Sequence, residues 1–100
     1  MFIAMNRFRI APGSEDTFEE LWRKRESYLD EVPGFREFHL LRGASDGECT
    51  LYASHSVWES RQAFEAWTAS ESFRKAHARA RGPSGTTLGH PKFEGFDVIL

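Results

Sequence analysis

The side chains best able to do chemistry in this sequence are four histidines, one of which stands apart. His77 follows Phe73 by four residues, so on a helix both side chains lie on one apolar face. His39, His55 and His90 fall on expected strands or beside a proline, where surface or hydrogen-bonded roles are typical. No second histidine or cysteine stands at metal-ligand spacing from His77, so the chain offers no zinc site. His77 is therefore either a hydrogen-bonded boundary residue or the ligand of a metal whose other donors come from outside the protein.

A single histidine is sufficient for haem iron, because the porphyrin supplies four nitrogens and the protein one axial ligand. Two further residues bear on such a pocket. Trp67 lies on the apolar stripe of the helix that precedes His77. Asn6 is an amide in an apolar row of a strand, and burying it without partners costs about 1–3 kcal/mol. Asn6 must therefore bond the backbone, lie at an edge or point as a donor into a pocket.

The composition excludes several classes of function. The chain has 100 residues, of which 40% are hydrophobic and 28% charged, as is ordinary for a folded domain. Its formal net charge of −2 provides no basic face for nucleic acid. It contains no Gly-x-Gly-x-x-Gly, P-loop, Gly-x-Ser-x-Gly or His-Glu-x-x-His motif. If the protein is an enzyme, its reactivity must come largely from a bound molecule.

Cysteine usage and the N-terminus indicate a compartment. The single Cys49 excludes an internal disulfide, suits a reducing cytoplasm and is expected to be a small buried strand residue. The first residues lack the basic region and long apolar run of a signal peptide, and no apolar stretch approaches membrane-spanning length. We therefore expect one cytoplasmic domain over residues 1–100, with neither a membrane nor a nucleic acid as its partner.

The elements that must position these residues follow from periodicity and turn signals. The strand over 2–10 places Phe2, Ala4, Asn6, Phe8 and Ile10 on one face. The remaining elements, in order, are a helix capped by Ser14 and running to about residue 30, a strand over 35–42, a turn at Asp46-Gly47, a strand over 49–57, a helical pair over 58–80, a Gly/Pro-rich loop over 81–91, and a closing strand with Phe93, Phe96, Val98 and Ile99.

Two start signals divide the helical pair. Ser56 opens a Ser-x-x-Glu capping box for the first helix, and Thr68, or alternatively Ser70, caps a second. On one straight helix Trp67 and His77 would lie about 15 Å apart along the axis and roughly 80° apart around it. A break between the two caps instead lets two short helices wall a single pocket.

The order β-α-β-β-α-β predicts an α+β, ferredoxin-like fold with both helices on one face of an antiparallel sheet. The opposite face of such a sheet is normally polar. Here Ile3 and Met5 oppose Phe2 and Phe8 on the first strand, and the second strand is also apolar on both faces. An apolar face of that size needs a cover, which predicts a homodimer packed sheet to sheet.

Asn6, Trp67 and His77, set in this order of elements, resemble the IsdG-type haem-degrading monooxygenases of the antibiotic biosynthesis monooxygenase superfamily. The resemblance covers nearly the whole chain, including the Ala-Phe-Glu-Ala-Trp helix and the segment Ser-Glu-Ser-Phe-Arg-Lys-Ala-His. It implies a dimeric α/β barrel that cleaves haem, which is both cofactor and substrate, with O2 and electrons from an external donor. An unidentified reductase would be a further partner, and iron would be released.

The resemblance also implies a role for each residue. His77 would be the axial ligand of the iron, Asn6 would donate its amide N–H towards iron-bound dioxygen, and Trp67 would press the porphyrin out of plane. Phe8, Phe64 and Phe73 would form apolar walls. Arg79 and Arg81, with the 82–90 loop, would meet the propionates or act as a lid.

Two other functions stay open at this point. One is a cofactor-independent monooxygenase of the same fold, acting on a quinol or polyketide aromatic, which has no need of an axial ligand at His77. The other is a non-catalytic haem-binding module, which would bind through His77 without consuming haem. Haem titration followed by a reductant in air separates the three.

Overall fold

The protein is described from a computed structural model, which covers residues 1–24, 29–71, 73–74 and 85–100 in enough detail to discuss. The elements within these residues follow the predicted β-α-β-β-α-β order. Their bounds are β1 (Phe2–Ile10), α1 (Glu15–Lys24), the short 3-10 helix η1 (Leu29–Glu31), β2 (Phe35–Ser45), β3 (Thr50–Trp58), α2 (Arg61–Thr68) and β4 (Lys92–Asp97).

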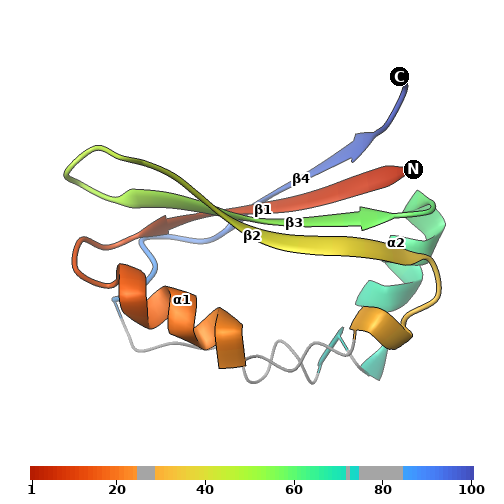
Figure 1. Ribbon diagram of the computed structural model, residues 1–100, viewed down its shortest axis with the longest axis horizontal. Helices are drawn as coiled ribbons and strands as arrows, with labels where there is room; N and C mark the ends of the chain where they lie inside the picture. The colour runs from red at the N-terminus through yellow and green to blue at the C-terminus, as the bar shows by residue number, and fades with distance from the viewer. Residues whose placement is uncertain (25–28, 72, 75–84) are drawn as a thin grey trace.

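The four strands form one antiparallel sheet in the order β2-β3-β1-β4. The two central strands, β1 and β3, pair without interruption from Phe2 opposite Trp58 to Ile10 opposite Thr50. Both α1 and α2 lie on the same side of this sheet (Figure 1). The predicted α+β, ferredoxin-like fold is therefore confirmed.

The helix-covered face of the sheet carries the core. On β1 the even-numbered Phe2, Ala4 and Ile10 are buried, whereas Arg7 and Arg9 of the opposite row are exposed. This alternation forms two clusters, one at each end of the strand. The first has Phe2, Ala4, Leu29 and Trp58 at its centre, under α2, and the second has Ile10, Phe18 and Tyr52, under α1.

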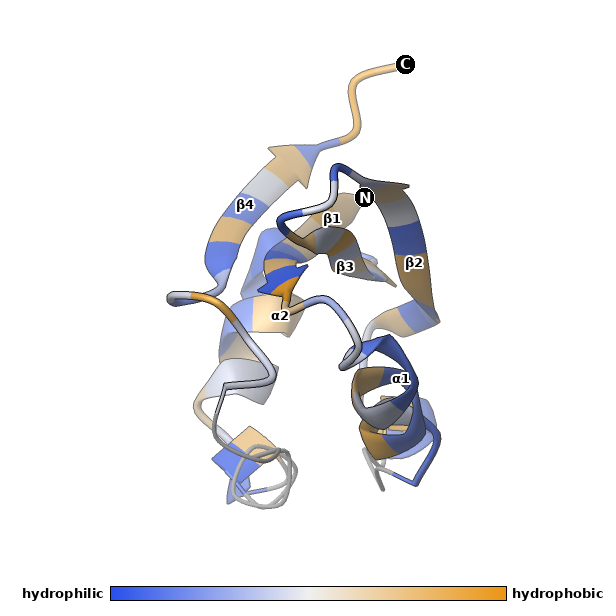
Figure 2. Ribbon diagram, turned by 90° about the vertical axis from the view of Figure 1, so that its left-hand side faces the viewer, coloured by the Kyte–Doolittle hydropathy of each residue, from blue (hydrophilic) through white to orange (hydrophobic). Residues whose placement is uncertain are grey.

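The other face of the sheet has no helix over it among the described residues, and it carries large apolar side chains beside charged ones (Figure 2). Ile3 lies between its cross-strand partners Val57 and Phe96, and Phe96 is 45% exposed. Leu41 on β2 is 42% exposed on the same face. The apolar residues expected on this face are present, but they share it with charged residues such as Arg7 and Glu94, which form an ion pair.

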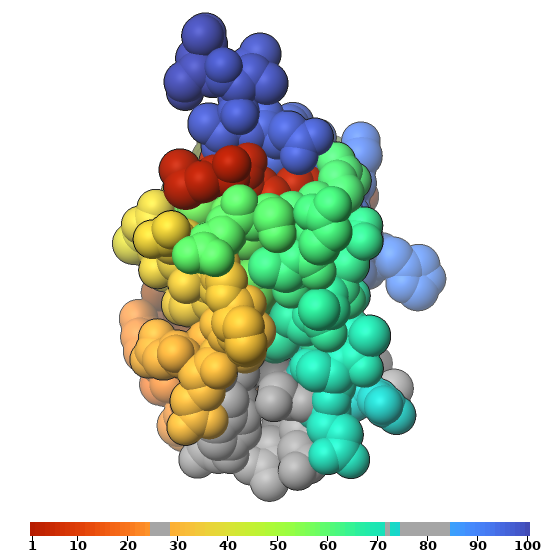
Figure 3. Space-filling model, turned by 90° about the vertical axis from the view of Figure 1, so that its right-hand side faces the viewer, coloured from red at the N-terminus to blue at the C-terminus, as the bar shows by residue number. Residues whose placement is uncertain are grey.

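Three predicted boundaries are wrong by a few residues. The strand predicted over 35–42 continues to Ser45, and the closing strand ends at Asp97, so Val98 and Ile99 lie beyond it. The C-terminal residues stand clear of the body at the top of Figure 3, where Ile99 is 86% exposed. Cys49 is buried, as predicted, but precedes β3 by one residue.

The helices α1 and α2 also differ from the predicted helices at one end each. The helix α1 begins as expected after Ser14 and ends at Lys24; residues 25–28 lie outside the described part, and η1 covers residues 29–31. Ser56 does not cap α2. It lies within β3, and the cap is Ser60, whose hydroxyl accepts a hydrogen bond from the backbone N–H of Ala63 at 3.1 Å.

Candidate functional site

A cavity of 540 Å³ opens between the inner face of the sheet and the helices. It lies within the range of about 300–1,000 Å³ that is usual for small-molecule and cofactor sites. The described residues that line it are uncharged and half of them are aromatic: Ala4, Asn6, Trp22, Leu29, Phe38, Ser54, Ser56, Phe64, Trp67, Thr68, Phe73 and Phe93.

The sheet forms the floor of this cavity. Asn6 on β1 has Ser54 of β3 and Phe93 of β4 as its cross-strand partners, so the three side chains share one face. The neighbouring row places Ser56 opposite Ala4. Asn6 thus lies on the cavity floor, in line with the prediction that its amide faces a pocket.

The helix α2 forms one wall, through Phe64 and Trp67. The Phe64 ring stacks on Phe93 of the sheet, with centroids 5.6 Å apart and planes 7° apart. The Trp67 ring lies 5.3 Å from that of Trp58, the fully buried residue that ends β3. Because Trp58 is fixed in the core, its contact orients Trp67 towards the cavity.

A break after α2 brings Phe73 back onto the same cavity. Ala69 is the C-cap of α2, and the Ser70 hydroxyl accepts a hydrogen bond from the Phe73 backbone N–H at 3.2 Å, as an N-cap does. The Phe73 ring then meets Trp67 edge to face, 4.8 Å away at 88°. The predicted break is confirmed, and Ser70 is the second cap; the Thr68 hydroxyl instead donates to the Glu65 carbonyl.

His77 lies outside the described residues, as do Arg79 and Arg81, so their predicted roles stay predictions. Phe8 was expected as a wall but is not among the lining residues. It packs instead against Phe18 and Trp22, at 5.3 and 5.9 Å between ring centroids. The physical reason is that α1 crosses the sheet at this end of β1 and covers the Phe8 side chain.

Sequence reasoning missed several lining residues. Trp22 and Phe38 stack at 5.6 Å and 17°, and both line the cavity. Ser54 and Ser56 carried a usable signal, because the period of two puts them on the same face as Trp58. Phe93 could be found only through the pairing of β4 with β1.

No charged side chain lines the cavity among the described residues, and none of their His, Cys, Asp and Glu side chains gather in threes to hold a metal ion. A metal in this cavity would therefore have to bring most of its own ligands. The described helices also include none long and apolar enough to cross a bilayer.

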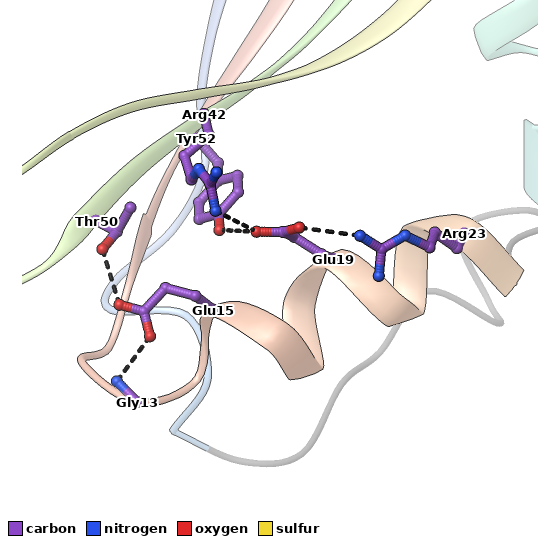
Figure 4. Close-up of polar contacts among 7 residues, drawn as sticks. All are labelled: Gly13, Glu15, Glu19, Arg23, Arg42, Thr50 and Tyr52. Carbon is purple, nitrogen blue, oxygen red and sulfur yellow. Dashed lines mark hydrogen bonds and ion pairs between the residues drawn. The ribbon is translucent and has the colours of Figure 1, made fainter.

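A smaller cavity of 350 Å³ lies on the other side of Trp22 and Phe38, and its lining includes the charged residues Glu19, Arg23 and Arg42. Figure 4 shows the polar contacts among these three residues and Tyr52. There the Tyr52 hydroxyl donates to Glu19 Oε2 at 2.5 Å, and Arg42 and Arg23 each contact the same carboxylate at 3.2 Å. The bond from Tyr52, followed by the charges of Arg42 and Arg23, holds the pKa of Glu19 below its ordinary value. The charge of the Glu19 carboxylate is thus balanced by its own partners, and these bonds link α1 to β2 and β3.

Comparison with known proteins agrees with this geometry. The sequence profile of the family described as "Antibiotic biosynthesis monooxygenase" matches residues 1–79. A staphylobilin-producing heme oxygenase of Staphylococcus haemolyticus is 27% identical over 77 residues, which are 77% of this chain and 73% of that protein.

Two solved structures illustrate the range of similar folds. The haem degrader MhuD of Mycobacterium tuberculosis, solved with two haems in its active site, has a TM-score of 0.77 at 29% identity and covers 100% of this chain and 97% of its own. The cofactor-independent oxygenase SnoaB of Streptomyces nogalater, as its N63A mutant, has a TM-score of 0.72 at 20% identity, with 99% and 93% covered, and shows the fold alone.

The profile match spans more than three quarters of the sequence, the strand order is that of the ferredoxin-like fold, and the solved relatives superpose over the whole chain. The chain belongs to the antibiotic biosynthesis monooxygenase family.

Proposed function

We propose that this single-domain protein is a haem-degrading monooxygenase, which cleaves the porphyrin with O2 and external electrons and releases iron. One observation carries the proposal. As far as the structure describes its lining, the cavity is an uncharged, largely aromatic pocket with the Asn6 amide on its sheet side and Trp67 on its helix side. Similarity to the haem degrader MhuD and to the staphylococcal heme oxygenase supports the same activity.

The residues present fit a haem. Flat apolar ligands bind where aromatic side chains present faces and edges, and the lining provides Phe64, Phe73 and Phe93 in addition to Trp67. The absence of charge among the described lining residues suits a porphyrin that carries four ligands for its iron. When bound, haem supplies the metal at which O2 is activated and the ring that is oxidised.

The chain would contribute position, shape and one ligand. His77, which follows Phe73 by four residues, is proposed as the axial ligand because it continues the segment that returns to the cavity. Asn6 would donate its amide N–H on the sheet side, in surroundings that exclude water. Trp67 is held between Trp58 and Phe73, so it would press on a bound ring rather than yield to it.

A second copy of the chain is proposed to cover the outer face of the sheet. Leu41 and Phe96 are large exposed apolar residues on that face, and sheet-to-sheet packing would bury both. This would give the dimeric barrel that the resemblance implies. The external electron donor is proposed to be a separate reductase, acting on the loaded protein in a cytoplasmic setting.

Haemin titration tests the proposal. The purified protein is expected to develop a Soret band with one-step saturation, and the band is expected to bleach when ascorbate is added in air. Mass spectrometry of the product would then show an opened tetrapyrrole. Failure to bind haemin would favour the cofactor-independent alternative, and a Soret band that survives the reductant would favour a haem-binding module without catalysis.

A further inference from the structure

A polar pair crosses the middle of the cavity floor, although the sequence pointed to only one of its members. Ser54 on β3 is the cross-strand partner of Asn6 on β1, and both line the cavity. The same row continues to Leu40 on β2 and Phe93 on β4. This row of the floor is therefore polar at its centre, between two apolar side chains.

The hydroxyl of Ser54 differs from the other inward hydroxyls of β3. Thr50 donates to Glu15 at 2.9 Å, Tyr52 donates to Glu19 at 2.5 Å, and Ser56 donates to a backbone carbonyl of β1 at 3.4 Å. Ser54 is 8% exposed, and within the described part of the chain its side chain makes no hydrogen bond. Its hydrogen-bonding capacity is thus directed into the cavity.

We propose that Ser54 is a second hydrogen-bond donor of this site and acts beside Asn6 on the bound molecule. The inference rests on the proposed function and deepens it. Cross-strand partners have Cβ atoms about 4.5–5.5 Å apart, so an amide N–H and a hydroxyl O–H from this pair reach one small ligand together. Two donors stabilise an anionic or polarised ligand atom more than one donor does.

Small ligands of a haem-loaded protein provide the test, with azide for the ferric form and carbon monoxide for the ferrous form. Ser54→Ala is expected to raise the dissociation constant for azide about two- to tenfold, the effect of one hydrogen bond of ordinary net strength. It is also expected to shift the carbon monoxide stretching vibration to higher frequency, since a lost donor weakens back-donation into the ligand. Asn6→Ala should shift both readouts in the same direction.

Two further variants separate the hydroxyl from its volume. Ser54→Thr keeps the hydroxyl and should retain the azide affinity, whereas the nearly isosteric Ser54→Val should lose it. This pair carries the test if Ser54→Ala does not fold. Thr50→Val is the matched control, because it removes a buried hydroxyl from the same face of β3 but outside the cavity, and it should lower thermal stability without changing azide affinity.

The outcomes are distinct. Equal azide affinity and equal carbon monoxide frequency in the Thr and Val variants would overturn the role of Ser54 and leave the proposed function intact. A wild-type protein that forms no haem complex would overturn both.

Discussion

At the scale of single residues, the sequence pointed to Asn6 and Trp67 for different physical reasons, and both line one cavity. Asn6 was identifiable because an amide interrupts an apolar row with a period of two. Trp67 was identifiable from a helical stripe. The period of two also places Ser54 on the inner face, but only the hydrogen bonds of its neighbours distinguish it from the other hydroxyls of β3.

The proposed axial ligand gives the first prediction. His77→Ala is expected to abolish the ligated Soret spectrum, because none of the described residues that line the cavity is a histidine, cysteine, methionine or tyrosine that could replace it on iron. His90→Ala is the matched control, since His90 is exposed in the loop before β4. Absorption spectra of haemin-loaded protein provide the measurement, and an unchanged Soret position in His77→Ala would remove this ligand.

The carboxylates that fasten α1 to β3 give a prediction about pH. A bond from its own backbone N–H, followed by one from the Thr50 hydroxyl, lowers the pKa of Glu15, and the bond from Tyr52 lowers that of Glu19, in each case below the ordinary value of 4.5. A lowered pKa means that the folded state favours the charged form, so these bonds stabilise the fold above pH 4.5. Their contribution should disappear as the pH falls below this value.

Tyr52→Phe tests this linkage, because it removes the donor to Glu19 and leaves the buried ring in place (Figure 4). Its thermal midpoint should lie a few degrees below that of the wild type at pH 7, and the difference should shrink as the pH falls below 4.5. Calorimetry at several pH values provides the measurement. A difference that does not change with pH would mean that the hydroxyl acts through packing alone.

At the scale of elements, the order and type of the four strands and of α1 and α2 could be predicted, whereas the 3-10 helix η1 and several ends could not. Ser56 and Ser60 both carry a helix-start signal, and only pairing with β1 decides that Ser56 continues the strand. The strand β2 runs past Arg42 because an irregularity in its pairing with β3 lets it continue to Ser45. Such outcomes depend on tertiary partners that local patterns do not contain.

The approach of α2 to the start of β2 gives an element-scale prediction. Gly34 has φ of +83°, and a Cβ built on it would lie 2.5 Å from the Cβ of Ala63. Gly34→Ala should therefore combine a backbone cost of about 1–2 kcal/mol with an overpacking cost of about 1–3 kcal/mol. Urea unfolding measures the total.

Gly47→Ala separates the two costs. Gly47 has φ of +85°, but its added Cβ would meet nothing within 4 Å, so this variant should show the backbone cost alone. Equal destabilisation by the two substitutions would mean that α2 moves away from Gly34 without loss.

At the scale of the whole molecule, the fold could be predicted because the β-α-β-β-α-β order allows few topologies, but the cavity could not. Its volume arises where Trp22, which packs against the cluster under α1, meets Phe38, Phe64 and Trp67, which pack against the cluster under α2. Neither cluster is a continuous stretch of sequence. The site therefore depends on how two layers are spaced, which is set by packing across the whole domain.

The exposed apolar residues on the outer face of the sheet give the prediction at this scale. Leu41→Lys should convert the proposed dimer into a monomer, because it would place a charge in a face-to-face sheet contact. Ala66→Lys is the control, since Ala66 is exposed on α2, on the other side of the sheet. Light scattering after size-exclusion chromatography gives the mass; a wild-type monomer would contradict the proposed assembly.

The three tryptophans of the chain all lie in or next to the 540 Å³ cavity. Trp22 and Trp67 line the cavity, and Trp58 lies 5.3 Å from Trp67. Every tryptophan is thus close to a ligand bound in the cavity. A ligand that absorbs near the tryptophan emission, such as haem, should therefore quench nearly all of the tryptophan fluorescence by energy transfer. Intrinsic fluorescence should therefore report ligand binding in this cavity without any added dye or label.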